Sequence, residues 1–243
     1  MGVSMREFLS KIVLIFVVAQ LCVADTRLRT AASDPIDRPK TVLAIGDSIS
    51  LGEGALGLSV NCALNDESNS LEASFASSVA VNLNAELEVW AWSGHGLTRN
   101  YDDFKSPTIA TRAEAKLDLA RSLDFDLVLL HVGTNDFHQY DASEQFIVSY
   151  RVLLERLSKA FPNAALVALS GPMLAPADRA RFRDAVDEAV RAHNATRQEG
   201  LVQTLHFSES LAPEQPFGCA WHPSQIMHEA MARDILGILQ NEF

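Results

Sequence analysis

The sequence contains few cysteines and few basic side chains. Only three of its 243 residues are cysteine, and 20 lysine and arginine residues stand against 31 aspartate and glutamate residues, a formal net charge of −11 at pH 7. Such acidity disfavours nucleic acid and anionic membrane surfaces as partners. His193, His206 and His228 stand at no metal-ligand spacing from a cysteine or an acid. We therefore expect no metal site and no nucleic-acid partner.

Long apolar runs are also scarce, and the one near the start of the chain predicts a secretory signal peptide over residues 1–24. Arg6 and Lys11 precede an apolar run over 12–23, and the small residues at its end predict cleavage after Ala24. The run is too short for a comfortable transmembrane span. We expect a secreted or periplasmic protein with no stable membrane insertion after cleavage; an uncleaved N-terminal anchor is the alternative.

The remaining chain reads as a linker followed by one domain. Residues 25–39 are polar and contain proline, which predicts a linker, and residues 40–243 are long enough for one α/β domain with a sizeable core. Two cysteines, Cys62 and Cys219, remain after cleavage. In an oxidising compartment they can form one disulfide, and the alternative is two buried free thiols.

Strand and helix patterns alternate along this domain. Apolar runs dense in β-branched and other aliphatic residues predict strands buried on both faces at 41–45, 87–92, 127–132, 165–170 and 201–207. Apolar residues at helical spacing predict helices near 71–84, 108–122, 141–161, 177–198 and 224–240. This alternation predicts an α/β fold, a three-layer α/β/α sandwich around a five-stranded parallel sheet.

Polar, glycine-containing turns follow the first three predicted strands, at 46–48, 93–96 and 133–136. In a parallel sheet, ligands bind outside the carboxyl ends of the strands. Ser48 can sit at a helix N-terminus there, with its own backbone N–H and the helix dipole facing a developing oxyanion. Gly94 offers a second backbone N–H and Asn135 an amide donor. These three residues form the expected oxyanion hole.

His222 supplies the base that a serine nucleophile needs. It precedes Pro223, which can occupy the first turn of the last predicted helix, so the imidazole is expected on a rigid, exposed loop. Histidine has a pKa near neutrality and can take the serine proton. Ser48 and His222 are thus the candidate catalytic residues, and this chemistry needs no cofactor.

The four blocks around Ser48, Gly94, Asn135 and His222 resemble those of SGNH/GDSL hydrolases. Three stretches, 92–101, 132–137 and 218–224, are similar to the catalytic domain of family-two carbohydrate esterases, which deacetylate xylan and related polysaccharides. The resemblance implies a flavodoxin-like SGNH fold over residues 40–243 and hydrolysis of short acyl esters, above all acetyl esters on a small-molecule or polysaccharide carbohydrate. An acyltransferase, a lipase or thioesterase, and a catalytically weak carbohydrate-binding protein remain as alternatives.

One position departs from the related hydrolases. They usually place an aspartate two or three residues before the histidine, whereas this chain has Ala220 and Cys219 there. We expect a backbone carbonyl to hold the imidazole instead, which gives a Ser–His dyad; Glu214 is the alternative. Similar cysteine placements in relatives imply a disulfide between Cys62 and Cys219.

Three further residues are expected to bind substrate. The bulky side chains of Phe137 and Trp221 are predicted to wall the acyl or sugar pocket, and His95, between two glycines, is predicted to contact substrate. Arg99 is expected to pair with Asp102 or Asp103 as a structural clamp.

Overall fold

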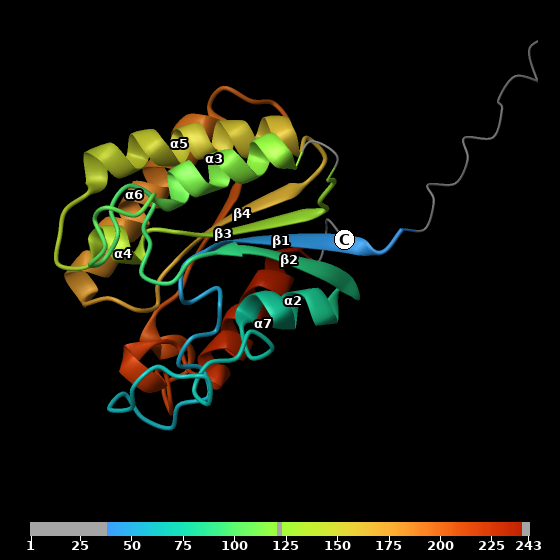
Figure 1. The fold of residues 1–243 in the computed structure, drawn as a ribbon. Helices are drawn as coiled ribbons and strands as arrows, with labels where there is room; N and C mark the ends of the chain where they lie inside the picture. Colours follow the sequence, from blue (N-terminus) through green and yellow to red (C-terminus); the bar gives the residue numbers. More distant parts are fainter. Residues whose placement is uncertain (1–37, 121–122, 240–243) are drawn as a thin grey trace, which may run out of the picture. The chain divides into compact units, whose positions relative to one another are not determined.

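The computed structural model describes residues 38–120 and 123–239. The predicted signal peptide, and all of the predicted linker except residues 38 and 39, lie outside them. In the described residues, five parallel strands form one sheet in the order β2-β1-β3-β4-β5 (Figure 1). The strands are β1 (Lys40–Gly46), β2 (Ala85–Ala91), β3 (Leu127–His131), β4 (Ala165–Ser170) and β5 (Gln203–His206). The predicted five-stranded parallel sheet is therefore confirmed.

Helices cover both faces of this sheet (Figure 1). One face carries α3 (Ile109–Leu119), α5 (Ser143–Ala160) and α6 (Pro176–Asn194), and the other carries α2 (Phe75–Asn82) and α7 (Gln225–Leu239). Short helical turns complete the domain at α4 (Thr134–Phe137), η1 (Glu209–Leu211) and η2 (Cys219–Trp221). The three-layer sandwich is thus present, and none of the helices described is long and apolar enough to cross a membrane.

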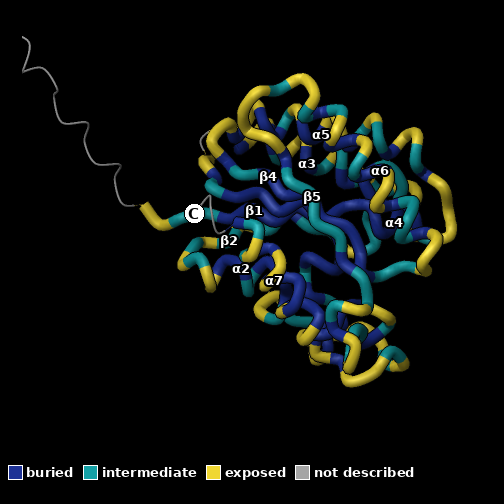
Figure 2. The backbone as a smooth tube through the Cα atoms, turned by 180° about the vertical axis from the view of Figure 1, so that it is seen from behind, coloured by how far each residue is buried: buried dark blue, intermediate teal, exposed yellow. Residues whose placement is uncertain are grey.

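The central strands separate two apolar clusters. Because side chains alternate across a strand, Leu43 and Ile45 of β1 pack under α3 and α5, whereas Val42 and Ala44 pack against α2 and α7. The strands β1, β3 and β4 are buried on both faces, as expected (Figure 2). The edge strands β2 and β5 are mostly only half-buried, since each has a strand on one side only.

Several elements differ from their expected bounds, and for the helices α2 and α6 the reason is visible. Helix α2 begins at Phe75 because the Ser74 side chain accepts a hydrogen bond from the backbone N–H of Ser77 and caps it there. Helix α6 ends at Asn194, whose side-chain amide donates to the carbonyl of Val202 and accepts from its N–H. This pair of hydrogen bonds ends α6 and directs the chain toward β5. Helices α2 and α6 are therefore shorter than predicted.

A buried histidine connects α2 and α7, the two helices that cover one face of the sheet. The backbone N–H of Phe75, at the start of α2, donates to Nδ1 of His228 in α7 over 3.2 Å, and the two rings stack. The imidazole is fully buried, and burial lowers its pKa to about 3. The accepting nitrogen must be unprotonated, so this contact requires the neutral imidazole.

We predict that His228 makes the fold sensitive to acid. The unfolded chain protonates this imidazole below about pH 6.5, whereas the folded protein does so only near pH 3. The free energy of unfolding should therefore fall as the pH falls from about 6.5 to 3, by up to about 1.4 kcal/mol per pH unit. Urea unfolding of the wild type and His228→Gln across this range isolates the effect. Equal slopes in the two proteins would contradict it.

Candidate active site

Ser48 lies in the turn that follows β1, at the carboxyl end of the sheet. The chain from Asp47 to Leu56 forms successive turns, because the N–H of Glu53 bonds to the carbonyl of Ser48 and that of Leu51 to the carbonyl of Asp47. The expected helix beginning at Ser48 is absent, so the expectation of a helix dipole there is wrong. The buried Asp47 carboxylate accepts from the N–H of Ile49 and fixes the turn.

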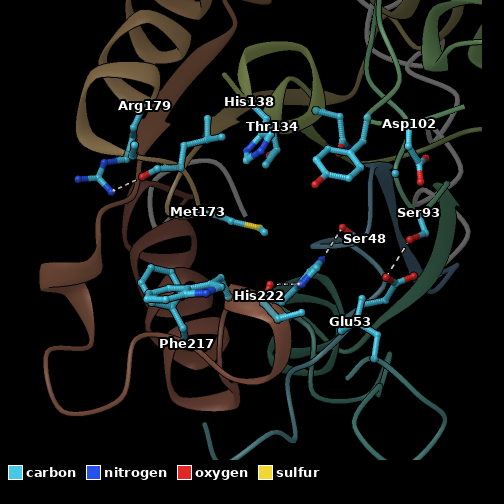
Figure 3. A pocket seen from close by; sticks show the side chains of 18 of the residues that line it. Ser48, Glu53, Ser93, Asp102, Thr134, His138, Met173, Arg179, Phe217 and His222 are labelled. Carbon is cyan, nitrogen blue, oxygen red and sulfur yellow. Dashed lines mark hydrogen bonds between the residues drawn. The ribbon is translucent and has the colours of Figure 1, made fainter. Parts of the chain in front are cut away.

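His222 reaches Ser48 from the far end of the chain. Its Nε2 lies 2.8 Å from the Ser48 hydroxyl oxygen, and its Nδ1 lies 3.2 Å from the carbonyl oxygen of Ala220 (Figure 3). If Nε2 accepts the serine proton, Nδ1 carries the hydrogen that the carbonyl accepts. None of the carboxylates among residues 38–120 and 123–239, Glu214 included, forms a hydrogen bond with this ring.

The carbonyl of Ala220 points at His222 because the chain bends sharply in η2. Ala220 and Trp221 have φ values of 49° and 63°, in the left-handed region that non-glycine residues rarely occupy. Two contacts hold the bend. The N–H of Gly218 donates to the His222 carbonyl, and that of His222 donates to the Cys219 carbonyl.

The loop after Ser48 supports the same bend from outside. A disulfide joins Cys62 to Cys219, so the expected pairing is present in the structure. The N–H groups of Cys219 and Ala220 donate to the carbonyls of Gly54 and Val60. Gly54–Cys62 and the histidine loop are therefore one unit, fastened by backbone hydrogen bonds and a covalent bond.

A buried carboxylate joins the second and third polar turns. Asp136 accepts hydrogen bonds from the N–H groups of Leu97 and Thr98 at 2.7 Å each, from the Thr98 hydroxyl at 2.7 Å and from the Arg99 N–H at 3.1 Å. Burial raises the pKa of the Asp136 carboxyl above its usual value, and these hydrogen bonds offset part of that rise. We call these bonds the Asp136 clamp. Because β2 and β3 lie on opposite sides of β1, the clamp spans the strand that Ser48 follows.

The clamp also places the residues expected to stabilise an oxyanion. The Asn135 side-chain amide donates one hydrogen to the His95 carbonyl over 2.8 Å, which leaves its second hydrogen for another acceptor. The Arg99 guanidinium donates to the Asn135 carbonyl over 3.4 Å. Gly94 has φ of 69°, which glycine adopts without strain. Asn135 and Gly94 are thus brought to the same cavity as Ser48.

This cavity has a volume of about 760 Å³ and opens between unlike walls (Figure 3). One wall carries polar groups, with the Ser93 hydroxyl donating to the Glu53 carboxylate over 2.8 Å. The opposite wall is apolar and includes Met173 and Phe217. Of the residues predicted for the site, Ser48, Gly94, Asn135, Trp221 and His222 all line it.

Two residues predicted to bind substrate lie elsewhere. Phe137 is fully buried and packs against Phe146 and Phe182 in the core, so the prediction that it walls the pocket is wrong. His95 does not line the cavity: its Nδ1 bonds to the Ser93 carbonyl and its Nε2 to the Arg112 guanidinium. Both ring nitrogens of His95 are therefore used in contacts within the protein. The structure gives no support for a substrate contact.

Arg99 also differs from expectation. Its guanidinium makes no ion pair with Asp102 or Asp103; it lies 5.1 Å from the ring centroid of Phe104 and 5.0 Å from that of Tyr140. An ion pair between Arg179 and Glu209 was not predicted from the sequence, and both residues line the cavity. No motif marks either residue. In the part of the chain that the structure describes, no cluster of three metal-ligating side chains occurs.

Comparison with known proteins identifies relatives over most of the chain. The cellulase/esterase CelE of Acetivibrio thermocellus is 31% identical over 223 residues, 87% of this chain and 26% of that protein. An acetylxylan esterase/glucomannan deacetylase of Cellvibrio japonicus is 24% identical over 215 residues, 83% of this chain and 56% of that protein. The chain therefore spans between a quarter and just over half of the length of these relatives.

Solved structures agree with these matches. A family-two carbohydrate esterase from Clostridium thermocellum in complex with cellohexaose superposes with a TM-score of 0.75 and 27% identity, over 84% of this chain and 65% of that chain. The corresponding esterase from Cellvibrio japonicus has the same fold, with a TM-score of 0.69 and 20% identity over 83% of this chain and 61% of that one.

A sequence model of the GDSL-like lipase/acylhydrolase family matches residues 44–230, which include Ser48, Gly94, Asn135 and His222. The match covers more than half of the chain and contains the hydrogen-bonded pair of Ser48 and His222. This chain therefore belongs to the GDSL-like lipase/acylhydrolase family.

Proposed function

We propose that this protein is an exported esterase that removes acetyl and other short acyl groups from carbohydrate, through an acyl–Ser48 intermediate. The observation that carries the proposal is the 2.8 Å contact between Ser48 and His222, at the wall of a cavity, in a chain 31% identical to a cellulase/esterase. Export to a secreted or periplasmic location rests on the signal-like N-terminal segment.

The reaction begins with proton transfer from Ser48 to Nε2 of His222 as the serine oxygen attacks the ester carbonyl. The ring is charged after this transfer, and its Nδ1–H points at the Ala220 carbonyl. A carbonyl dipole stabilises the imidazolium less than a carboxylate would, but it fixes the same tautomer and ring orientation. Ser48 and His222 thus act as a dyad.

The negative charge then develops on the former carbonyl oxygen. The donors proposed to bind it are the backbone N–H groups of Ser48 and Gly94 and the second hydrogen of the Asn135 amide, all on residues that line the cavity. His222 next donates its proton to the leaving sugar hydroxyl. It finally takes a proton from the attacking water and returns it to the Ser48 oxygen as the carboxylic acid is released.

The acyl preference is supported chiefly by the relatives. The cavity volume of about 760 Å³ is far more than an acetyl group needs, and Phe137, once expected to restrict it, lies in the core. A cavity of this size suits a sugar with its acetyl group. The preference for acetyl therefore follows from the similarity to an acetylxylan esterase/glucomannan deacetylase.

We predict that the enzyme releases acetate from acetylated xylan or glucomannan and cleaves p-nitrophenyl acetate faster than the octanoate. Initial rates on a chain-length series of p-nitrophenyl esters measure the preference, and assay of free acetate measures the polysaccharide reaction. Ser48→Ala is the control and should lose at least 99% of the activity while keeping its fold. Faster turnover of octanoate would favour a lipase, and acetylated sugar formed without free acetate would favour a transferase.

We predict that Asp136→Asn lowers kcat about 10- to 100-fold with little change in KM. The new amide places N–H groups against backbone donors, so the clamp no longer holds Gly94 and Asn135 in register, and oxyanion contacts act in the transition state. Asp141→Asn is the matched control, because this exposed carboxylate also accepts a backbone hydrogen bond, from Ser143, but lies outside the cavity. A raised KM at unchanged kcat would argue against this role, and thermal unfolding monitors the fold.

We predict that reducing the disulfide lowers both stability and rate. Loss of a native disulfide commonly costs about 2–5 kcal/mol, and here it also releases the loop that aims the Ala220 carbonyl at His222. The rate should fall at temperatures where circular dichroism still reports a folded protein. A Cys62→Ala/Cys219→Ala variant should show the same loss without reductant and no further loss with it. Free thiols at Cys62 and Cys219 in the denatured, unreduced protein would exclude the bond.

A further inference from the structure

Exposed aromatic side chains gather at one place on this protein. Among the described residues, the exposed phenylalanine, tyrosine and tryptophan side chains are Tyr101, Phe104, Tyr140 and Trp221, with exposed fractions between 50% and 67%. Tyr101 and Trp221 line the active-site cavity. Large exposed apolar surfaces in soluble proteins commonly mark binding sites, so the position of the other two rings is informative.

Phe104 and Tyr140 lie just outside the cavity wall. Both pack around Arg99, whose guanidinium also donates to the carbonyl of Asn135, a cavity residue. The wall itself is formed there by Tyr101 and His138, whose rings are 5.2 Å apart. These two residues are near neighbours in sequence of Phe104 and Tyr140 respectively. The same two segments of the chain, 101–104 and 138–140, therefore supply rings that line the cavity and rings that pack on Arg99.

We call Arg99, Phe104 and Tyr140 the outer platform. The loop that carries Arg99 and Phe104 is held in place. The Asn100 side chain donates to the carbonyls of Asp103 and Ser106, and the Asp136 clamp fixes Arg99. Phe104 nevertheless exposes 67% of its surface. A loop pinned this firmly, with an apolar ring left in solvent, is preorganised for a ligand.

The chemistry of the platform suits a sugar ring. The C–H face of a pyranose is apolar and packs on an aromatic ring, while its hydroxyls can accept from a guanidinium. Arg99 makes no ion pair with a carboxylate of the described residues, so its donors beyond the one used for Asn135 are not neutralised there. The acidic balance of the chain and the Glu53 and Asp102 carboxylates at the cavity disfavour an anionic sugar.

We propose that the outer platform is a subsite for a neutral pyranose of a polysaccharide, next to the sugar whose ester is cleaved in the cavity. The inference rests on the proposed carbohydrate esterase function. It goes further in assigning Phe104 and Tyr140 to chain-length recognition: oligosaccharides long enough to cross the Tyr101–His138 wall gain a contact that a single acetylated sugar lacks.

The test compares Phe104→Leu and Tyr140→Leu with the wild type. Leucine keeps an apolar contact with Arg99 but has no aromatic face, so the Asn135 support is retained. Acetylated xylo- or manno-oligosaccharides of increasing length are compared with p-nitrophenyl acetate, which has no neighbouring sugar. We expect the ratio of kcat/KM on the longer oligosaccharides to kcat/KM on p-nitrophenyl acetate to fall about five- to tenfold, mostly through KM.

The control is Val148→Ala/Val152→Ala, which removes exposed apolar surface on α5 instead. Equal losses on all substrates, no loss on any, or the same loss in the α5 variant would overturn the outer platform. A change in oligomeric state in place of sugar binding, measured by light scattering, would assign the rings to a contact between copies. If the wild type releases no acetate from any acetylated saccharide, the carbohydrate function itself fails. Unchanged leucine variants in an active wild type reject only the subsite.

Discussion

The hydrogen bond between Ser48 and His222 joins side chains 174 residues apart in sequence, and the rest of the site is arranged around it. Strand β1 fixes one partner at the edge of a buried sheet. The other partner lies on a loop with little core of its own, and the backbone carbonyls of Gly54 and Val60 and the Cys62–Cys219 disulfide hold it. The segment that follows Ser48 therefore also positions His222.

The Ala220 carbonyl contacts the ring nitrogen that an aspartate holds in a Ser–His–Asp triad. To aim it, Ala220 and Trp221 adopt left-handed backbone conformations, which cost about 1–2 kcal/mol per residue. The hydrogen bonds and the disulfide around η2 offset this strain. A neutral acceptor gives less charge stabilisation than an aspartate, but it belongs to the backbone and has no rotamers to lose. The proposed dyad thus relies on rigidity where a Ser–His–Asp triad relies on charge.

The sequence was sufficient to predict the sheet and the residues at its carboxyl edge, because buried parallel strands and glycine-containing turns leave strong local patterns. The prediction that Phe137 lines the pocket was wrong. This residue shares one helical turn with Asn135, and successive side chains on a helix point about 100° apart. Asn135 therefore faces the cavity while Phe137 packs against α6. Arg99 was mispredicted for a related reason: its aromatic partners include Tyr140, which only the folded chain brings near.

Binding and chemistry meet in the loop that follows β2. This loop contains Gly94, which is proposed as an oxyanion donor, and Thr98 and Arg99 of the Asp136 clamp. It also contains Phe104 of the proposed sugar subsite. A rigid loop transmits a displacement at one end to the other. A sugar seated on Phe104 would then favour the loop position in which Gly94 and Asn135 are aligned for the oxyanion. Remote contacts can in this way contribute to the transition state as well as to binding, and the Asp136 carboxylate is the physical link between them.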